Sequence, residues 1–503
     1  MAAHFPFSAL LSEISIYQTG LIVILVTLPL YIVGRGIYYA YFHSLAKIPG
    51  PKLYIFSALP YYYYLLKGDW HQQLKLLHDQ YGPVVGYTYN DVSFTSATAF
   101  KTIYGHNAGG DRNFEKDVRV YSKERPQSNI VNAGNEDHRR MRRLISHAFS
   151  EKALANQEEV IKQYVDLFIG RLLVRAKSGE VVDLVAWYNF ATFDLIGDLA
   201  FGQSFGCLDT EAYHPWVRMI FDTLKILVYK DIAKRLNLSS LIPYLVPAKL
   251  KKSTKEHYEL STQTAMKRLE TKNMDREDFM SYFLRYNDER GMSAPELADN
   301  ANILIIAGSE TTATLLSGTT FLLLKNPEKY RKVAEEIRTS FQSEDEITIS
   351  RVNQLSYMLA TFSEGFRMCP QCLHLYLVQC QKKEILLMVI FSLRILHCLF
   401  PTGKLFKRGE ISRIHKAISL RDDLTIPSTQ ATKNRSSNLS LSAPATVLGR
   451  TYAEMRPLLA RLLWNFDIKI MPDSLDWNKQ KVYTLWEKGS LNVKLTKVER
   501  NSA

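Results

Sequence analysis

The most informative stretch of this chain reads Ala301-Asn302-Ile303-Leu304-Ile305-Ile306-Ala307-Gly308-Ser309-Glu310-Thr311-Thr312-Ala313-Thr314. It lies within residues 296–324, where apolar residues recur every three or four positions, and this spacing predicts a long helix. Gly308 and the adjacent threonines lower helix propensity, so a helix with a structural role alone would favour alanine or leucine there. Two explanations remain: small residues that let two core helices pack closely, or a function that needs a gap, an acid and a hydroxyl group.

A second signal follows downstream as Glu364-Gly365-Phe366-Arg367. An acid and a base three positions apart on a helix usually form a surface ion pair worth a few tenths of a kcal/mol. Here the apolar run Leu355-Ser356-Tyr357-Met358-Leu359-Ala360-Thr361-Phe362 precedes the pair and predicts its burial. A buried ion pair must be fully hydrogen-bonded, so Glu364 and Arg367 are predicted to form a structural lock and not to take part in chemistry.

Together, the two motifs and their spacing resemble the cytochrome P450 monooxygenases. The resemblance implies a mainly α fold with a small β-sheet region and a haem whose iron is held by a cysteine thiolate. It also implies that Gly308 leaves room for dioxygen above the haem, while Glu310 and Thr311 are the catalytic acid and hydroxyl that deliver protons. In the family, the Glu364–Arg367 lock supports the core on the opposite side of the haem.

Other stretches narrow the resemblance to fungal enzymes of secondary metabolism, of the isotrichodermin C-15 hydroxylase type. They are Gly68-Asp69-Trp70-His71, Asn90-Asp91-Val92-Ser93-Phe94 and the run from Trp187 to Gly202. The implied reaction inserts one oxygen atom into a C–H bond of a small apolar metabolite. The sequence contains no Gly-x-Gly-x-x-Gly loop, so electrons must come from a partner, which the family implies is a membrane-bound NADPH-cytochrome P450 reductase.

A basic segment, residues 136–149, has two interpretations. Charge clusters of this kind are usually a solvated helix face. In the family, however, a helix at this place contacts a haem propionate through two residues four positions apart, and His138 and Arg142 match that spacing. Side chains four apart share one helix face, and a guanidinium can bind a carboxylate with two hydrogen bonds. Arg139, Arg140 and Arg143 are competing donors.

The family's third signature is missing. A Gly-rich loop ending in Cys-x-Gly is expected before a helix that begins at Tyr452, but the chain reads Ala445-Thr446-Val447-Leu448-Gly449-Arg450, with Val447 at the position of the axial cysteine. The resemblance stops after Met368 and returns at Leu448. Good matches on both sides of an unrelated block favour a reading-frame disturbance, in the gene or in its splicing, over true divergence.

The cysteines of this block offer no replacement. Cys369 and Cys372 have the spacing of a zinc knuckle, but no second pair lies at a zinc-site distance, so no metal site is predicted. A thiolate ligand needs a Gly-rich loop whose amides can approach the sulfur, and 371–447 has only Gly403 and Gly409. The polar tract 421–442 reads as disordered.

The N-terminus predicts a membrane anchor. The 21 residues from Ile14 to Gly34 carry no charge, which is enough to cross a ~30 Å hydrocarbon layer as a helix. A cleaved signal peptide is the alternative, but its apolar core is usually shorter and ends at small residues. Arg35 and Lys47 follow the span, so a single pass through the endoplasmic reticulum membrane with a cytosolic body is expected. The turn Lys47-Ile48-Pro49-Gly50-Pro51 then separates the body from the anchor.

Composition agrees with a large membrane-attached enzyme. The apolar fraction is 46%, which can fill a large core, and the net charge is +13. The basic residues are scattered and accompany no nucleic-acid motif, so membrane and protein partners are favoured over nucleic acid. The predicted organisation is a luminal tail, anchor and flank (1–46), the N-terminal part of the catalytic domain (47–368), a frame-disturbed or disordered block (369–447) and the C-terminal part of the domain (448–503). The alternative to an active monooxygenase is an inactive remnant of the family, a protein that lacks the axial thiolate and has no catalytic activity.

Overall fold

The computed structural model describes residues 16–96, 99, 115–117, 120–121, 128–271, 278–289, 291–369, 377–379, 386–389 and 445–499. Most of them are helical, as predicted. The longer helices are α2 (Ile16–Ile37), α5 (Trp70–Tyr81), α7 (Asn135–His147), α9 (Glu158–Ser178), α10 (Leu184–Phe201), α12 (Pro215–Arg235), α14 (Ala248–Glu270), α16 (Ala294–Leu324), α17 (Pro327–Ser340), α19 (Ser356–Met368) and α22 (Ala445–Asn465).

Short helical segments connect these helices. They are α3 (Lys52–Phe56), α4 (Leu59–Lys67), α8 (Glu151–Asn156), α11 (Cys207–Thr210), α13 (Ile242–Leu245), α15 (Phe279–Arg285) and α18 (Ile349–Val352), with single turns η1 (Tyr38–Phe42), η2 (Ser44–Lys47), η3 (Ser239–Leu241), η4 (Glu344–Glu346) and η6 (Pro472–Ser474). Apolar residues at three- and four-residue intervals predict one amphipathic helix from Ser150 to Ala176 and another over 257–269. The structure divides the first stretch into α8 and α9, and the second belongs to a longer helix, because α14 already begins at Ala248.

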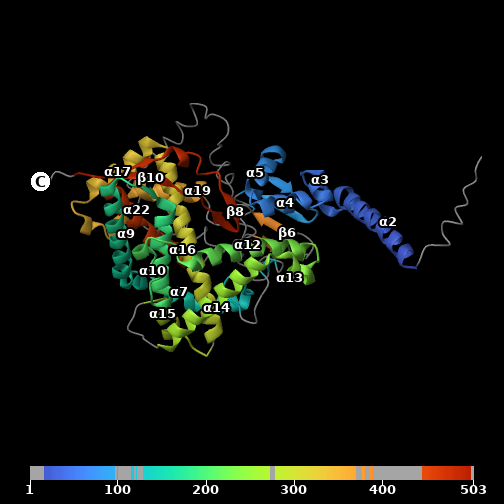
Figure 1. Ribbon diagram of the computed structural model, residues 1–503, viewed down its shortest axis with the longest axis horizontal. Helices are drawn as coiled ribbons and strands as arrows, with labels where there is room; N and C mark the ends of the chain where they lie inside the picture. The colour runs from blue at the N-terminus through green and yellow to red at the C-terminus, as the bar shows by residue number, and fades with distance from the viewer. Residues whose placement is uncertain are drawn as a thin grey trace, which may run out of the picture.

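Helix α16 crosses the centre of the body, as Figure 1 shows, and packs extensively against α10 and α14. Its start is well defined because Ser293 and Glu296 form a capping box and Pro295 occupies the first turn. Gly308 lies against α10: a Cβ atom placed on it would come within 2.5 Å of Ile196 Cδ1. Glycine at position 308 therefore allows α10 to pack closely against α16, and its role beside dioxygen stays a prediction.

The strands form three small sheets. Strands β1 (Val84–Gly86) and β2 (Asp91–Phe94) make the antiparallel hairpin that the sequence predicts around residues 81–95. They belong to a five-stranded sheet of order β1-β2-β6-β5-β3, a three-stranded sheet has the order β4-β10-β7, and β8 pairs with β9. The remaining bounds are β3 (Glu115–Lys116), β4 (Val181–Asp183), β5 (Leu377–Gln379), β6 (Leu386–Val389), β7 (Phe466–Ile470), β8 (Lys481–Tyr483), β9 (Leu485–Glu487) and β10 (Asn492–Lys497).

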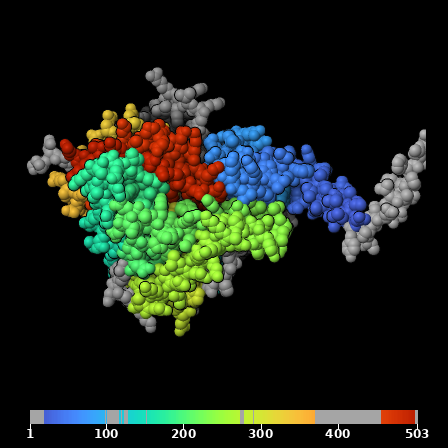
Figure 2. All heavy atoms as spheres, in the orientation of Figure 1, coloured from blue at the N-terminus to red at the C-terminus, as the bar shows by residue number. Residues whose placement is uncertain are grey.

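The C-terminal strands lie beside the N-terminal helices, although they are far apart in sequence. Figure 2 shows the red C-terminal residues in contact with the blue N-terminal part of the body. Lys481 of β8 contributes to this contact, because its Nζ lies 2.9 Å from Asp69 Oδ1. The strand pair β8–β9 is thus held against the body close to α12 and α16.

Helix α2 extends away from the body at the N-terminal end in Figure 1. Residues Gln18–Phe42 form the one stretch in the described part of the chain that is long and apolar enough to cross a membrane, and only 6% of its most apolar window is buried. This helix coincides with most of the predicted anchor. By length and composition it is compatible with a membrane span.

Helix α22 differs from expectation at its start. The sequence predicts a helix that begins at Tyr452, whereas α22 begins at Ala445 and includes Val447 in its first turn. The segment expected to be a cysteine-bearing loop is therefore helical in this chain. From Met455 onward the helix is part of the core, with Leu459, Leu462 and Leu463 fully buried.

Candidate active site

The two residues predicted to be catalytic lie next to each other on α16 but in different surroundings. The Glu310 side chain is buried, with an exposed fraction of 2%, and its Oε2 accepts a hydrogen bond of 2.9 Å from Lys488 Nζ. Lys488 also donates to Thr314 Oγ1 at 2.9 Å. Thr311 is only partly buried, and its hydroxyl donates to the carbonyl oxygen of Ala307.

Thr311 belongs to a partly exposed stripe on an otherwise buried helix. Ile303, Ala307 and Thr311, four residues apart, all retain some exposure, whereas most of α16 is buried. Residues four apart lie on one helix face. The stripe is therefore the side of α16 on which an apolar substrate or a planar cofactor could lie, and the Thr311 hydroxyl is its polar group.

Two arginines of the basic helix α7 form ion pairs with neighbouring parts of the chain. Arg140 donates to Glu296 Oε1 at 2.6 Å and to Asp137 Oδ1 at 3.0 Å, and Arg143 forms a two-fold contact with Asp288. These pairs hold α7 to the start of α16 and to the segment before it. The competing donors are thus already engaged with the protein.

Arg142 is different from its neighbours. Its side chain is partly buried, and within the described residues it forms neither a hydrogen bond nor an ion pair. A guanidinium that is half-removed from water and has no acceptor in the described structure is suited to an external carboxylate. His138 lies one turn earlier on α7 and is also partly buried. The arrangement fits the predicted propionate contact of Arg142.

The Glu364–Arg367 pair is formed, but the prediction of its burial is half wrong. Arg367 Nε donates to Glu364 Oε2 at 2.6 Å on α19. The Arg367 side chain is 10% exposed, whereas that of Glu364 is 55% exposed. The apolar residues that precede the pair lie on the side of α19 that faces the core, whereas Glu364 lies on the side that faces solvent. The pair therefore joins a largely buried arginine to an exposed glutamate.

This asymmetry predicts the cost of breaking the lock. We expect Glu364→Gln to lower the free energy of unfolding by about 1 kcal/mol, because one partner is exposed and water can replace much of the interaction. Urea unfolding of the full chain measures it. Glu335→Gln on the exposed face of α17 is the matched control and should change nothing measurable. A loss above about 3 kcal/mol would instead indicate a fully buried pair.

No described residue supplies a thiolate. Cys207 is buried, and burial next to Asp194 raises the pKa of its thiol to about 12. Cys369 ends α19 and lies against Gly318, where burial raises the pKa of its thiol to about 11. Burial therefore disfavours the thiolate form of both cysteines, and the axial ligand that the resemblance implies is a thiolate. Valine at position 447 has no atom that can bind iron, and Cys372, Cys380 and Cys398 lie outside the described residues. The haem contacts that the resemblance implies for Arg142 and Thr311 stay predictions.

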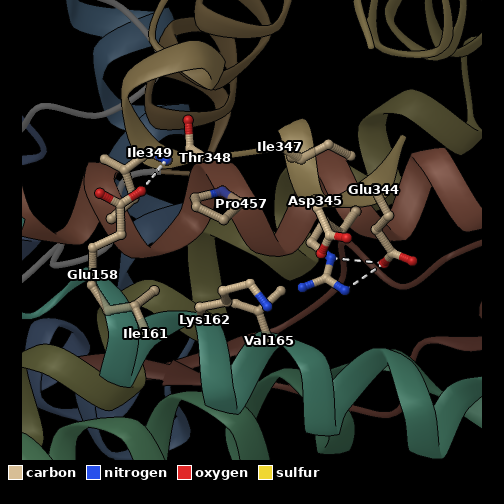
Figure 3. Close-up of a pocket in the computed structure, with 11 residues that line it drawn as sticks. Glu158, Ile161, Lys162, Val165, Glu344, Asp345, Ile347, Thr348, Ile349 and Pro457 are labelled. Carbon is tan, nitrogen blue, oxygen red and sulfur yellow. Dashed lines mark hydrogen bonds and ion pairs between the residues drawn. The ribbon is translucent and has the colours of Figure 1, made fainter. Parts of the chain in front are cut away.

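A pocket elsewhere in the fold is too small to serve as the site. Figure 3 shows it between α9, the segment 344–349 and α22, with Glu158 and Pro457 among its lining residues. Its cavity volume is about 40 Å³, which leaves room for a few water molecules and is far below the roughly 300–1,000 Å³ of small-molecule sites. Among the described residues, no group of three or more His, Cys, Asp or Glu side chains is placed to hold a metal ion.

The structure places a central helix with an acid and a hydroxyl group beside a basic helix, with an apolar helix at the N-terminal end. Comparison with known proteins identifies the class: residues 48–382 match the family described as Cytochrome P450. The chain belongs to the cytochrome P450 family. The matched region extends past Met368, where the sequence motifs of the family were expected to stop, and it includes strand β5.

Relatives are similar over nearly their whole length. The chain is 37% identical over 493 residues to cytochrome P450 monooxygenase aclL of Aspergillus oryzae, covering 95% of this chain and 99% of that protein. It is 38% identical over 476 residues to cytochrome P450 monooxygenase astA of Talaromyces wortmannii, covering 91% and 93%. It is 37% identical over 500 residues to the trichothecene C-4 hydroxylase of Trichoderma arundinaceum, covering 95% and 96%. The resemblance to fungal monooxygenases of secondary metabolism is confirmed.

Sequence reasoning missed Lys488. It lies just after β9 and binds Glu310, which is 178 positions away. A single lysine between a glutamate and a glycine matches no motif, so no local signal identifies it. Only the fold brings the two residues together.

Proposed function

We propose that the intact form of this protein is a haem-thiolate monooxygenase that hydroxylates a small apolar metabolite in a fungal secondary-metabolite pathway. The observation that carries the proposal is the position of Glu310 and Thr311 as consecutive residues of α16, with Glu310 buried and Thr311 on the partly exposed face. Membership of the cytochrome P450 family and the hydroxylase among its relatives support the reaction class.

The roles of the residues follow from their positions. Arg142 and His138 of α7 would bind a propionate of the haem, and the haem would supply the chemistry of dioxygen activation. The Thr311 hydroxyl would hold a proton at the partly exposed face of α16, and Glu310 would supply protons from the buried side. Glu364 and Arg367 have a structural role. A membrane-bound NADPH-cytochrome P450 reductase would supply the electrons.

The block 369–447 is proposed to be a reading-frame disturbance in an otherwise intact enzyme. The described ends of α19 and α22 on either side retain packed cores, since Phe362 and Leu459 are fully buried. The second candidate is an inactive remnant of the family, and the absence of a thiolate among the described residues supports it. A corrected chain with a Cys-x-Gly loop separates the two.

In that corrected chain, Thr311→Ala is the test of the catalytic assignment. We expect NADPH to be consumed while hydrogen peroxide replaces most of the hydroxylated product, because proton delivery by a positioned group contributes roughly 10²–10⁴-fold to a reaction. The ratio of product to NADPH consumed measures the effect. Thr339→Ala on the exposed end of α17 is the control and should stay coupled. Full coupling in Thr311→Ala would remove the role assigned to this hydroxyl.

The anchor has its own test. We propose that α2 crosses the endoplasmic reticulum membrane once, with the body in the cytosol. The full chain should therefore stay with the membrane fraction after carbonate extraction, because a span of about 20 apolar residues is held by the hydrocarbon layer. Removal of residues 1–46 should release the body or weaken its attachment. Release of the full chain into the soluble fraction would contradict the assignment.

A further inference from the structure

A buried ion pair joins the C-terminal segment to the centre of α16. Lys488 and Glu310 side chains are each 2% exposed, and Nζ lies 2.9 Å from Oε2. The ammonium makes a second bond to Thr314 Oγ1, and the Thr314 hydroxyl in turn donates to the Glu310 carbonyl oxygen at 2.7 Å. The ring of Phe221 on α12 lies 6.0 Å from the ammonium. These contacts fix the Glu310 carboxylate in one place.

The segment that carries Lys488 also binds α12. Glu487, the preceding residue, accepts a hydrogen bond of 2.5 Å from Lys225 Nζ of α12. Lys225 in turn lies over the ring of Tyr483 in β8. Two consecutive residues after the β8–β9 turn thus connect two helices: Glu487 binds α12, and Lys488 binds α16.

We propose that Lys488 is a positioning residue that keeps the Glu310 carboxylate charged and fixed on the buried side of α16, with the β8–β9 pair as its rigid support. The assignment rests on the proposed catalytic role of Glu310. A lone carboxylate at this depth would be strongly disfavoured and would take up a proton. The lysine offsets that cost, so Glu310 can rest as a carboxylate, take up a proton on the buried side of α16 and pass it on towards the side that carries Thr311.

The test uses the full chain as it stands and requires no bound haem. The variants are Lys488→Met, Lys488→Arg, Glu310→Gln and the double variant Lys488→Met/Glu310→Gln. Infrared spectroscopy at neutral pH detects a protonated buried carboxyl group, and thermal unfolding gives the Tm of each variant. Lys479→Met is the matched control, because Lys479 lies in the same segment but its ion pair with Asp476 is exposed.

We expect Lys488→Met to show a new protonated-carboxyl band that disappears in the double variant, and a Tm several degrees lower. Lys488→Arg should restore the charged state and show no band. The control should show neither change. The double variant should recover part of the Tm, because it no longer buries an acid without a cation.

The inference is overturned if Lys488→Met shows no such band and keeps the Tm of the parent chain. If Lys488→Met does not fold, recovery of folding in the double variant supports the inference, and failure of the double variant overturns it. The proposed function fails separately: a corrected chain in which Glu310→Gln stays fully coupled would remove the catalytic role of Glu310, while the infrared result would stand.

Discussion

When the polypeptide with this sequence is supplied with haem, reduced and exposed to carbon monoxide, we expect no absorption band of the thiolate type. This is the band that gives the family its name. The band requires a cysteine thiolate on the iron. We propose that Val447 stands at the position of the ligand, because it precedes the helix that follows the cysteine loop in the resemblance to the family. Burial raises the pKa of the Cys207 and Cys369 thiols and so disfavours the thiolate form of each.

The carbon monoxide difference spectrum of the purified chain measures this directly. The corrected chain with a Cys-x-Gly loop is the positive control and should show the band, because α16 and Arg142 are already present in the described fold. A clear band from the uncorrected chain would show that one of its five cysteines binds the iron. The assignment of Val447 to the ligand position would then be wrong.

A second large effect is expected at Arg235, which joins α12 to the N-terminal sheet. Arg235 donates to Asp91 at 2.6 Å and to Asp231 at 3.0 Å, and all three side chains are at most 6% exposed. Replacing Arg235 with methionine leaves two buried carboxylates without their cation. We expect the free energy of unfolding to fall by about 3–5 kcal/mol, the range for breaking a buried ion pair from one side.

Urea unfolding of the full chain measures this loss. The matched control is Arg143→Met, because the Arg143–Asp288 pair has similar geometry but both side chains are about half exposed. Exposed pairs contribute ~0–1 kcal/mol, so the control should lose little. An equal loss in the two variants would mean that burial does not determine the contribution of Arg235.

The helices could be predicted because their signals are local. Apolar periodicity placed residues 183–199, 213–236 and 296–324 in helices, and the structure has α10, α12 and α16 there. Element ends were less accurate. α22 starts at Ala445, ahead of Tyr452, although Gly449 lowers the helix propensity of the added turns. The hairpin at residues 84–94 was predicted because its alternation and flanking glycine are also local.

The surroundings of the site could not be predicted in the same way. Gly308 faces Ile196 because two helices distant in sequence cross there. The Lys488–Glu310 pair spans 178 positions and depends on the path of β8 and β9. Glu364 is exposed because α19 turns only one side to the core, and the apolar run before it does not say which side that is. The residue types of the site follow from motifs, whereas their partners follow from the tertiary fold.

The central claim is that this chain is a cytochrome P450 interrupted between α19 and α22 by a reading-frame disturbance. Sequencing the transcript across codons 368 to 448 tests it most directly. The account predicts a reading frame that encodes a Gly-rich loop with Cys-x-Gly ahead of α22. A transcript in which no reading frame across these codons encodes such a loop would contradict it and leave the inactive remnant as the identity of this protein.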